Sequence, residues 1–453
     1  MSMADFDRFL FAYTIGSHII LVSASIGLIL LIAILEIMNS RKKNPNYDIL
    51  LGRLKKIFVI SFGVGTASGI VMAVELINLF PTFMTLVSET GVIAAFYAEI
   101  FTFFLETIAL VMYVYYDGVF KWKYTNIALS LTIAAGTILS AVFITMVNAW
   151  MNTPNGFNIT TYLSTGTVTG VNPWAPFATV STFPEIAHVV TTTVFAGMMM
   201  LGVFFAIKYL RAREAGEKSL AVSALHIIGV VSIIDIVLVG ISGSHEMSTV
   251  LLQQPLKYAA FDLNYLPGSN MPERLFGSLV NGNVIGAITI PSVQSLLAGL
   301  ETNVSILPGL STYPQSLWPP LMIHTTFDTM VVGGLLIGLY LFIMFLMFVL
   351  KKDPIQYRAM IILQIIGGIF AFIIYELGWV TDEVGRQPWI VYNVLTVNNA
   401  INPSTALLVP GFFIVAFYLV IVPATFYFFS RIYSSQKIPK KAEKSLNQGG
   451  VNY

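Results

Sequence analysis

The sequence predicts an all-α integral membrane protein of about nine transmembrane helices, with the N-terminus outside and the C-terminus inside. Three observations predict this class. Hydrophobic residues make up 56% of the chain and charged residues only 10%, whereas a soluble domain carries roughly 25% charged residues. The mean hydropathy is +0.79. Apolar runs of about 20 residues or more recur along the 453 residues, and each is long enough to cross a bilayer core of about 30 Å.

The apolar runs divide the chain into spans, loops and a tail. We expect spans near residues 9–38, 55–80, 91–117, 124–150, 184–210, 219–243, 320–350, 357–380 and 403–431. They predict a single transmembrane domain over residues 1–436 and a polar cytoplasmic tail over 437–453. Residues 244–319 form a long outer loop, and a loop of that length is usually functional or disordered. Its turn residues alternate with charged residues, so we expect it to be partly ordered.

Basic residues set the orientation, because cytoplasmic loops of membrane proteins are enriched in Lys and Arg. With the N-terminus outside, all but four of the 24 Lys and Arg residues fall in inner loops or in the tail. The four that remain outside are Arg8, Lys257, Arg274 and Arg386. A different number of spans would scramble this division, so the helix count and the orientation support each other.

The chain has no cysteine, which excludes disulfides, iron–sulfur clusters and thiolate metal sites. The net charge of +1 gives no indication of nucleic-acid binding. Any metal must therefore be held by His, Met, Asp or Glu.

Several residues that can ligate a metal lie toward the outer ends of predicted spans. His18 lies about three turns into the first span, His188 begins the fifth, His324 and Met330 begin the seventh, and Glu383 follows the eighth. Imidazole, thioether and carboxylate groups without cysteine suit haem iron, and a His/Met pair gives a low-spin haem. The alternative for each histidine is a polar residue that bonds a neighbouring helix.

Glu99 and Glu106 lie seven residues apart in the third span. They are within about 20° of the same helix face and roughly 10 Å apart along the axis. A charged side chain near the bilayer centre costs about 2.5 kcal/mol or more, so two such residues predict a proton relay. The alternative is a pair of protonated glutamates that bond neighbouring helices.

The densest polar cluster near a membrane face is GWVTDEVGRQPW at residues 378–389. Trp379 and Trp389 suit the membrane interface. Arg386 suits the carboxylates of haem propionates, because guanidinium binds carboxylate in a bidentate manner. The alternative is an interfacial anchor with an ordinary Glu–Arg pair.

Together these segments resemble subunit I of the cytochrome bd quinol oxidases. GRQPW at 385–389, with GW at 378–379 and Glu383 upstream, is the most specific part of the likeness. The other matching segments are RFLFAYTIGSH at 8–18, GTASG at 65–69, FFLE at 103–106, LSA at 139–141 and NAWMNTP at 148–154. The resemblance runs from the first span through the ninth and leaves out the tail.

The resemblance implies three haems near the outer face, two of type b and a third of type d or b. His188 and Met330 would ligate the low-spin haem b. His18 and Glu383 would be axial ligands of the other two haems, in an order that stays open. Trp379, Arg386, Gln387 and Trp389 of the motif are expected to bind the cofactor, with Arg386 beside the reacting groups.

The resemblance also implies a proton path and a quinol site. Glu106 matches the proton-path glutamate of the family, and Ser140 matches a polar residue on a second path. Lys257 and Asp262, in the outer loop, keep the family's five-residue spacing between a lysine and an acid at the quinol site. We expect Lys257 on a wet part of the loop to contact quinol.

Three departures from the family bear on these assignments. Glu99 lies seven residues before Glu106, where the family has eight, so its place near the oxygen-reactive haem is open. Asp328 stands two residues before Met330, where the family has Arg, and an ionised Asp328 at the haem edge would lower the midpoint potential. Alternatively Asp328 is protonated or faces a partner subunit. His324 has no counterpart in the family and is a possible further haem ligand.

These observations predict the haem- and quinol-binding subunit of a terminal oxidase in a prokaryotic cell membrane. It would oxidise quinol at the outer face and reduce dioxygen to water with protons from inside, which is electrogenic without a pump. The expected partner is a second membrane subunit, either subunit II-like or a related copy of subunit I. The alternatives are a haem subunit with another electron acceptor, a haem-free paralogue and an ion transporter, although no repeated halves support a transporter.

Overall fold

The computed structural model describes residues 3–116, 119, 122, 124–436 and 438. Within these residues, nine helices are long and apolar enough to cross a membrane, as the sequence predicts. They are α1 (Met3–Arg41), α2 (Pro45–Leu79), α4 (Ile93–Tyr115), α5 (Thr125–Asn152), α7 (Thr182–Arg211), α8 (Ala215–Gln253), α11 (Met322–Val349), α12 (Arg358–Gly385) and α14 (Leu408–Ser435). The predicted tail at 437–453 lies outside the described residues, apart from residue 438.

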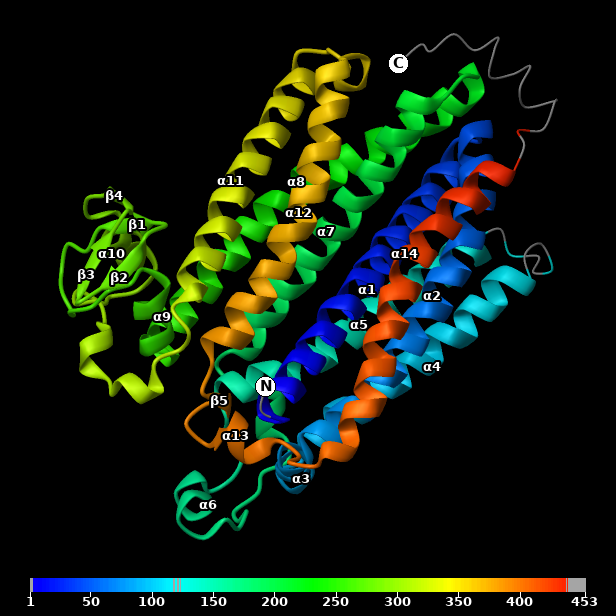
Figure 1. The fold of residues 1–453 in the computed structure, drawn as a ribbon. Helices are drawn as coiled ribbons and strands as arrows, with labels where there is room; N and C mark the ends of the chain where they lie inside the picture. The colour runs from blue at the N-terminus through cyan, green and yellow to red at the C-terminus, as the bar shows by residue number, and fades with distance from the viewer. Residues whose placement is uncertain (1–2, 117–118, 120–121, 123, 437, 439–453) are drawn as a thin grey trace.

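The spans form two groups that meet along α1, α5 and α7 (Figure 1). Helices α7, α8, α11 and α12 pack against one another in the first group, and α1, α2, α4, α5 and α14 make up the second. Consecutive spans run antiparallel, so α1 begins and α14 ends at opposite ends of the bundle. The candidate ligands therefore lie at the end where α1 begins.

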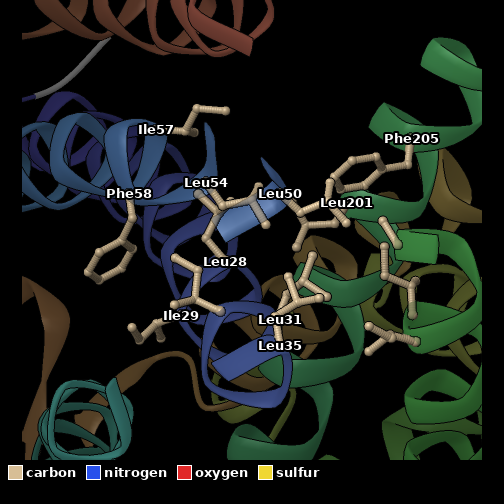
Figure 2. Packing of buried hydrophobic residues seen from close by; sticks show 14 of the residues in the cluster. Leu28, Ile29, Leu31, Leu35, Leu50, Leu54, Ile57, Phe58, Leu201 and Phe205 are labelled. Atoms are coloured by element: carbon tan, nitrogen blue, oxygen red, sulfur yellow. The ribbon is translucent and has the colours of Figure 1, made fainter. Parts of the chain in front are cut away.

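The core between the two groups is packed with aliphatic and aromatic side chains from α1, α2 and α7. Figure 2 shows part of this cluster: Leu28, Ile29, Leu31, Leu35, Leu50, Leu54, Ile57, Phe58, Leu201 and Phe205. Glycine brings α1 and α7 into backbone contact, because a Cβ on Gly197 would lie 2.3 Å from the Ser23 carbonyl oxygen. Small residues at such crossings are typical of membrane helices, whose association depends on close packing.

Short elements gather at the end of the bundle where α1 begins (Figure 1). They are α3 (Pro81–Glu89), α6 (Ile159–Thr165), η1 (Ala175–Ala178), β5 (Trp389–Val391), β6 (Leu395–Thr396), α13 (Val397–Ala400) and η5 (Thr405–Leu407). The described connection at the other end between α11 and α12 contains only the 3₁₀ turn η4 (Pro354–Gln356).

The long loop between α8 and α11 folds into a small module of its own beside α11 (Figure 1). It contains α9 (Pro255–Phe261), β1 (Glu273–Leu275), β2 (Ser278–Val280), β3 (Asn283–Ile285), β4 (Ile288–Ile290), α10 (Val293–Glu301), η2 (Leu310–Thr312) and η3 (Gln315–Leu317). Strand β1 pairs with β4 and β2 with β3, all antiparallel. The spans are all helical as predicted, and described strands occur only in the connections.

Two predicted helix ends were wrong. Helix α8 continues to Gln253, so residues 244–253, which we had assigned to the loop, are helical. Helix α12 continues to Gly385 and includes Glu383. In both cases the chain lacks a helix-breaking residue until Pro255 or Pro388, and the residue before a proline is disfavoured in the helical conformation.

Arg53 of α2 joins three helices at the basic end of the bundle. Its guanidinium donates to Glu217 of α8 at 2.8 and 2.6 Å and to the Gln436 carbonyl oxygen at 2.5 Å. The guanidinium carbon lies 4.6 Å from the ring centre of Tyr433. The Arg53 side chain is 1% exposed, so its charge depends on these partners.

We expect Arg53→Ala to lower the stability of the purified protein by about 2 kcal/mol, because it removes charged hydrogen bonds to the partly exposed Glu217 and the packing against Tyr433. The midpoint of thermal unfolding in detergent measures the change. Lys56→Ala is the matched control, because Lys56 is exposed on the same helix. An equal shift in both variants would contradict the role of Arg53.

Candidate functional site

His18 and His188 are each oriented by a serine on the neighbouring helix. The Nδ1 atom of His18 lies 3.0 Å from the hydroxyl of Ser68 on α2, and that of His188 lies 3.2 Å from the hydroxyl of Ser242 on α8. A hydrogen bond at one ring nitrogen fixes the ring and leaves Nε2 as the atom that can bind a metal.

Three of the four candidate ligands face a glycine on an adjacent helix. A Cβ built on Gly69 would lie 3.4 Å from His18, and one on Gly243 would lie 3.1 Å from His188. On α12, a Cβ on Gly378 would lie 3.1 Å from the sulfur of Met330. The glycines keep the space beside each ligand free of side chains.

This arrangement fits haem. Imidazole, thioether and carboxylate donors match the axial ligands that haem iron takes in proteins. The glycines let the ligand side chains lie against the neighbouring helices, where a Cβ would crowd them. Within the described residues, the buried Nε of Arg386 has no acceptor, so one N–H of this guanidinium remains for a propionate.

Arg386 is the centre of a buried hydrogen-bond network that joins α12 to α5. It donates to the side-chain oxygens of Asn148 at 2.8 Å and Asn152 at 2.9 Å, and it forms an ion pair with Glu383. Burial by itself lowers the pKa of Arg386, but the nearby carboxylates, Glu383 first, outweigh burial and raise the pKa. The guanidinium therefore stays charged and holds Glu383.

Lys257 does not lie on a wet part of the loop, as we had expected. It is 3% exposed and forms an ion pair with Asp382 of α12. The other Asp382 oxygen accepts from Asn148 at 2.8 Å. The ion pair connects the start of the loop to Asp382, the residue next to Glu383. Lys257 can reach Asp382 because α9 follows α8 directly and packs against it.

A cavity of about 80 Å³ lies between α9, η3 and the segment after α12. Lys257, Arg386, Gln387 and Trp389 line it, together with Tyr313 and other side chains from the end of the loop. Two cations, an amide and aromatic rings thus converge on one opening. The motif residues and the predicted quinol-site lysine meet here, although more than 100 residues separate them in the sequence.

Asp262 does not reach this cavity. It is 2% exposed and accepts a hydrogen bond of 2.5 Å from Gln294 of α10. Burial, followed by the charge of Glu273, raises the pKa of Asp262 well above its usual range, and burial also raises the pKa of Glu273. The two carboxyl groups share a hydrogen bond, so one of them carries a proton and Asp262 holds the loop together.

His324 and Asp328 correct two expectations. Both ring nitrogens of His324 are engaged by loop carbonyl oxygens, at 2.5 Å from Phe261 and 2.9 Å from Phe276. Both nitrogens are thus engaged by the loop in this structure, and neither is left to bind a metal. The Asp328 carboxylate accepts from the Phe276 N–H and faces the loop of the same chain. Asp328 thus faces the loop, whereas we had considered the haem edge or a partner subunit.

Glu99 and Glu106 both bond hydroxyl groups of α5. The Ser140 hydroxyl donates to Glu99 at 2.7 Å, and the Thr137 hydroxyl donates to Glu106 at 2.6 Å. Gly136 leaves room for Glu106, because a Cβ there would lie 3.1 Å from the Glu106 Cβ. Ser140, which we had placed on a second path, thus lies in the same helix interface as the two glutamates.

Comparison with known proteins agrees with this geometry. Residues 6–437 match the family described as cytochrome bd terminal oxidase subunit I. This chain belongs to that family. It is multi-pass in the membrane, and its named relatives are bacterial quinol oxidase subunits.

Individual relatives match over nearly the full length. A Bacillus subtilis protein that carries the name of a cytochrome bd menaquinol oxidase subunit I is 32% identical over 93% of this chain and 94% of its own. An Escherichia coli cytochrome bd-II ubiquinol oxidase subunit 1 is 23% identical over 98% of this chain and 97% of its own. The solved bd oxidase of Geobacillus thermodenitrificans matches with a TM-score of 0.88 and 28% identity, over 96% of this chain and 99% of that one.

Sequence reasoning missed several polar residues of this bd-family site. Asp382 carries two of its interactions, and Asn152 accepts from Arg386 while it donates to Glu185 of α7 at 3.0 Å. Gln254, which follows α8, donates to the Asn152 carbonyl oxygen at 3.1 Å. A signal was available, because Asn148 and Asn152 lie one helical turn apart on the same face of α5.

We expect Lys257→Met to destabilise the protein by about 3 kcal/mol, because it leaves the Asp382 carboxylate without its buried cation. Asp382→Asn in the same chain should restore most of the loss, because an amide needs no counter-ion. A double-mutant cycle on thermal unfolding measures the coupling, which should exceed about 1 kcal/mol. Additive effects of the two substitutions would mean that the ion pair contributes nothing.

Proposed function

We propose that this chain is the haem- and quinol-binding subunit of a terminal oxidase. It oxidises membrane quinol at the end where α1 begins, which is the outer side, and reduces dioxygen to water with protons taken from inside. The observation that carries the proposal is the set of His18, His188 and Met330, each of which faces a glycine at the same end of the bundle. Membership of the bd family supports the oxidase activity.

In this proposal His188 and Met330 would hold the low-spin haem b, and His18 and Glu383 would hold the other two. Bound haem supplies electron transfer and the reduction of dioxygen. Ser68 and Ser242 orient the two imidazoles, and Arg386 holds the Glu383 carboxylate. The third haem is of type d or type b.

Quinol binds with its ring edge at the cavity lined by Lys257, Arg386 and Trp389. Lys257 and Arg386 are each paired with a carboxylate, Asp382 or Glu383, and their N–H groups are donors that a quinol oxygen can accept from. Gln387 offers an amide for a further hydrogen bond, and Trp389 offers a flat surface for the ring. The relatives' names include both menaquinol and ubiquinol oxidases.

Protons reach the haem end along the interface between α4 and α5. Glu106 and Thr137, then Glu99 and Ser140, provide two successive carboxyl–hydroxyl pairs. Toward the basic end, Tyr113 of α4 donates to Glu36 at 2.6 Å. Quinol protons are released on the outer side and oxygen protons enter from the inner side, so turnover is electrogenic without a pump.

The proposed complex contains a second membrane subunit, either subunit II-like or a related copy of subunit I. The orientation rests on the basic inner loops, because Lys and Arg are enriched on the cytoplasmic side. Among the described residues, Arg53, Lys55 and Lys208 lie at the inner end, opposite the candidate ligands.

Haem content tests the proposal. We expect the purified protein to contain more than one haem, with carbon monoxide binding to only part of it, because a His/Met pair closes one iron whereas a single axial ligand leaves an iron open. Reduced-minus-oxidised spectra with and without carbon monoxide measure this. Absence of haem, or one species that does not respond to carbon monoxide, would be incompatible with an oxidase.

Proton delivery gives a second test. Glu106→Gln should slow oxygen reduction at least tenfold and leave the low-spin haem reducible by quinol, because an amide keeps the shape but cannot relay a proton. Thr107→Val is the control, because the Thr107 hydroxyl bonds only the Phe103 carbonyl oxygen of its own helix. Stopped-flow absorbance separates the two steps, and normal turnover of Glu106→Gln would make Glu106 structural.

A further inference from the structure

The first two turns of α11 present a histidine to the loop that precedes the helix. His324 Nδ1 lies 2.5 Å from the carbonyl oxygen of Phe261 at the end of α9. Its Nε2 lies 2.9 Å from the carbonyl oxygen of Phe276, between β1 and β2. A carbonyl oxygen only accepts hydrogen bonds, so a ring that bonds both oxygens carries a proton on each nitrogen, as an imidazolium does.

The surroundings of His324 suit a positive charge. Asp328, one helical turn along α11, places a carboxylate oxygen 3.3 Å from Nε2. Glu273 of β1 is a further acid near the ring, and the neighbouring Arg274 donates to Asn264 at 2.8 Å. His324 and Asp328 are each 1% exposed, and solvent screens buried charges weakly.

His324 and Asp328 together hold both backbone groups of Phe276. The Phe276 N–H donates to Asp328, and its carbonyl oxygen accepts from His324. Phe276 has a φ of +60°, a left-handed conformation that residues other than glycine rarely adopt. Such a conformation persists only where the surroundings determine it. One turn of α11 thus fixes the turn between β1 and β2.

The same side of α11 also holds the end of α9. The rings of Phe261 and Phe327 stack with their centres 4.6 Å apart and their planes 3° from parallel. Met330 contacts α12 instead, where Gly378 leaves space for its sulfur. The beginning of α11 therefore has two contact surfaces. One side binds the loop, and another packs against α12, the helix that carries Glu383.

We propose that His324, as an imidazolium, docks residues 261–276 of the loop on α11. This docking positions Lys257 and the adjacent cavity for quinol. His324 acts through the loop and does not touch quinol, so it is a positioning residue. The docking depends only on the contacts above. The effect on quinol rests on the proposed function.

Solid-state NMR of the purified complex with ¹⁵N-labelled histidine tests the charge directly. We expect a resonance of a doubly protonated ring that disappears in His324→Gln and persists in His245→Gln. His245 is the matched control, because it is an exposed histidine on α8. A spectrum in which His324→Gln removes only a neutral ring would overturn the proposal, and this measurement relies on the wild-type fold.

Hydrogen–deuterium exchange tests the docking. In His324→Gln, amides of the segment 261–290 should exchange roughly tenfold faster or more, because a charged hydrogen bond between buried groups is lost. Asp328→Asn keeps an acceptor for the Phe276 N–H and should show a smaller increase. His245→Gln should match the wild type. Unchanged exchange of this segment in His324→Gln would also overturn the proposal.

Quinol oxidation kinetics separate the positioning role of His324 from the proposed function. His324→Gln should raise the KM for quinol by roughly tenfold, while oxygen reduction driven by an artificial reductant keeps its kcat and the low-spin haem keeps its spectrum. Faster exchange with an unchanged KM would reject the positioning role. If the wild type itself does not oxidise quinol, the proposed function fails, and the NMR and exchange results still decide the docking.

Discussion

The buried guanidinium of Arg386 joins several elements at the end of the bundle where α1 begins. It donates to Asn148 and Asn152 of α5 and pairs with Glu383 of its own segment, while Asp382, next to Glu383, pairs with Lys257 of the loop. In a membrane bundle, burying one charge is costly unless acceptors surround it. The spans α5 and α12 and the loop therefore meet at one point, and a candidate haem ligand is fixed there.

Glycines complete this arrangement by controlling space. Where two helices should touch, Gly197 lets the backbones of α1 and α7 meet. At the candidate ligands, Gly243 and Gly378 let His188 and Met330 lie against the neighbouring helix. Lipid offers no hydrophobic force to press helices together, so close packing and polar bonds decide which surfaces meet. In both places glycine permits an approach that a Cβ would prevent, of a backbone in one case and of a side chain in the other.

The loop between α8 and α11 is attached to the bundle by polar and aromatic contacts with α11. It is joined to α11 by backbone hydrogen bonds to His324 and Asp328 and by the stacked rings of Phe261 and Phe327. The residue at 328 is Arg in the resembled family, and the sequence offered no reason for the change. The structure supplies one, because an acid at this position bonds the Phe276 N–H and faces the histidine one turn away.

The sequence by itself determined the nine spans, because helix length and apolar composition answer directly to the thickness of the bilayer. It also singled out His18, His188, Met330 and Glu383 as candidate ligands, because polar residues in apolar helices are few. Only the tertiary structure decided what Lys257, His324 and Asp328 contact, since their partners lie 48 to 125 residues away. Periodicity and composition describe one segment at a time, whereas hydrogen-bond partners across the loop depend on how it folds back on α11.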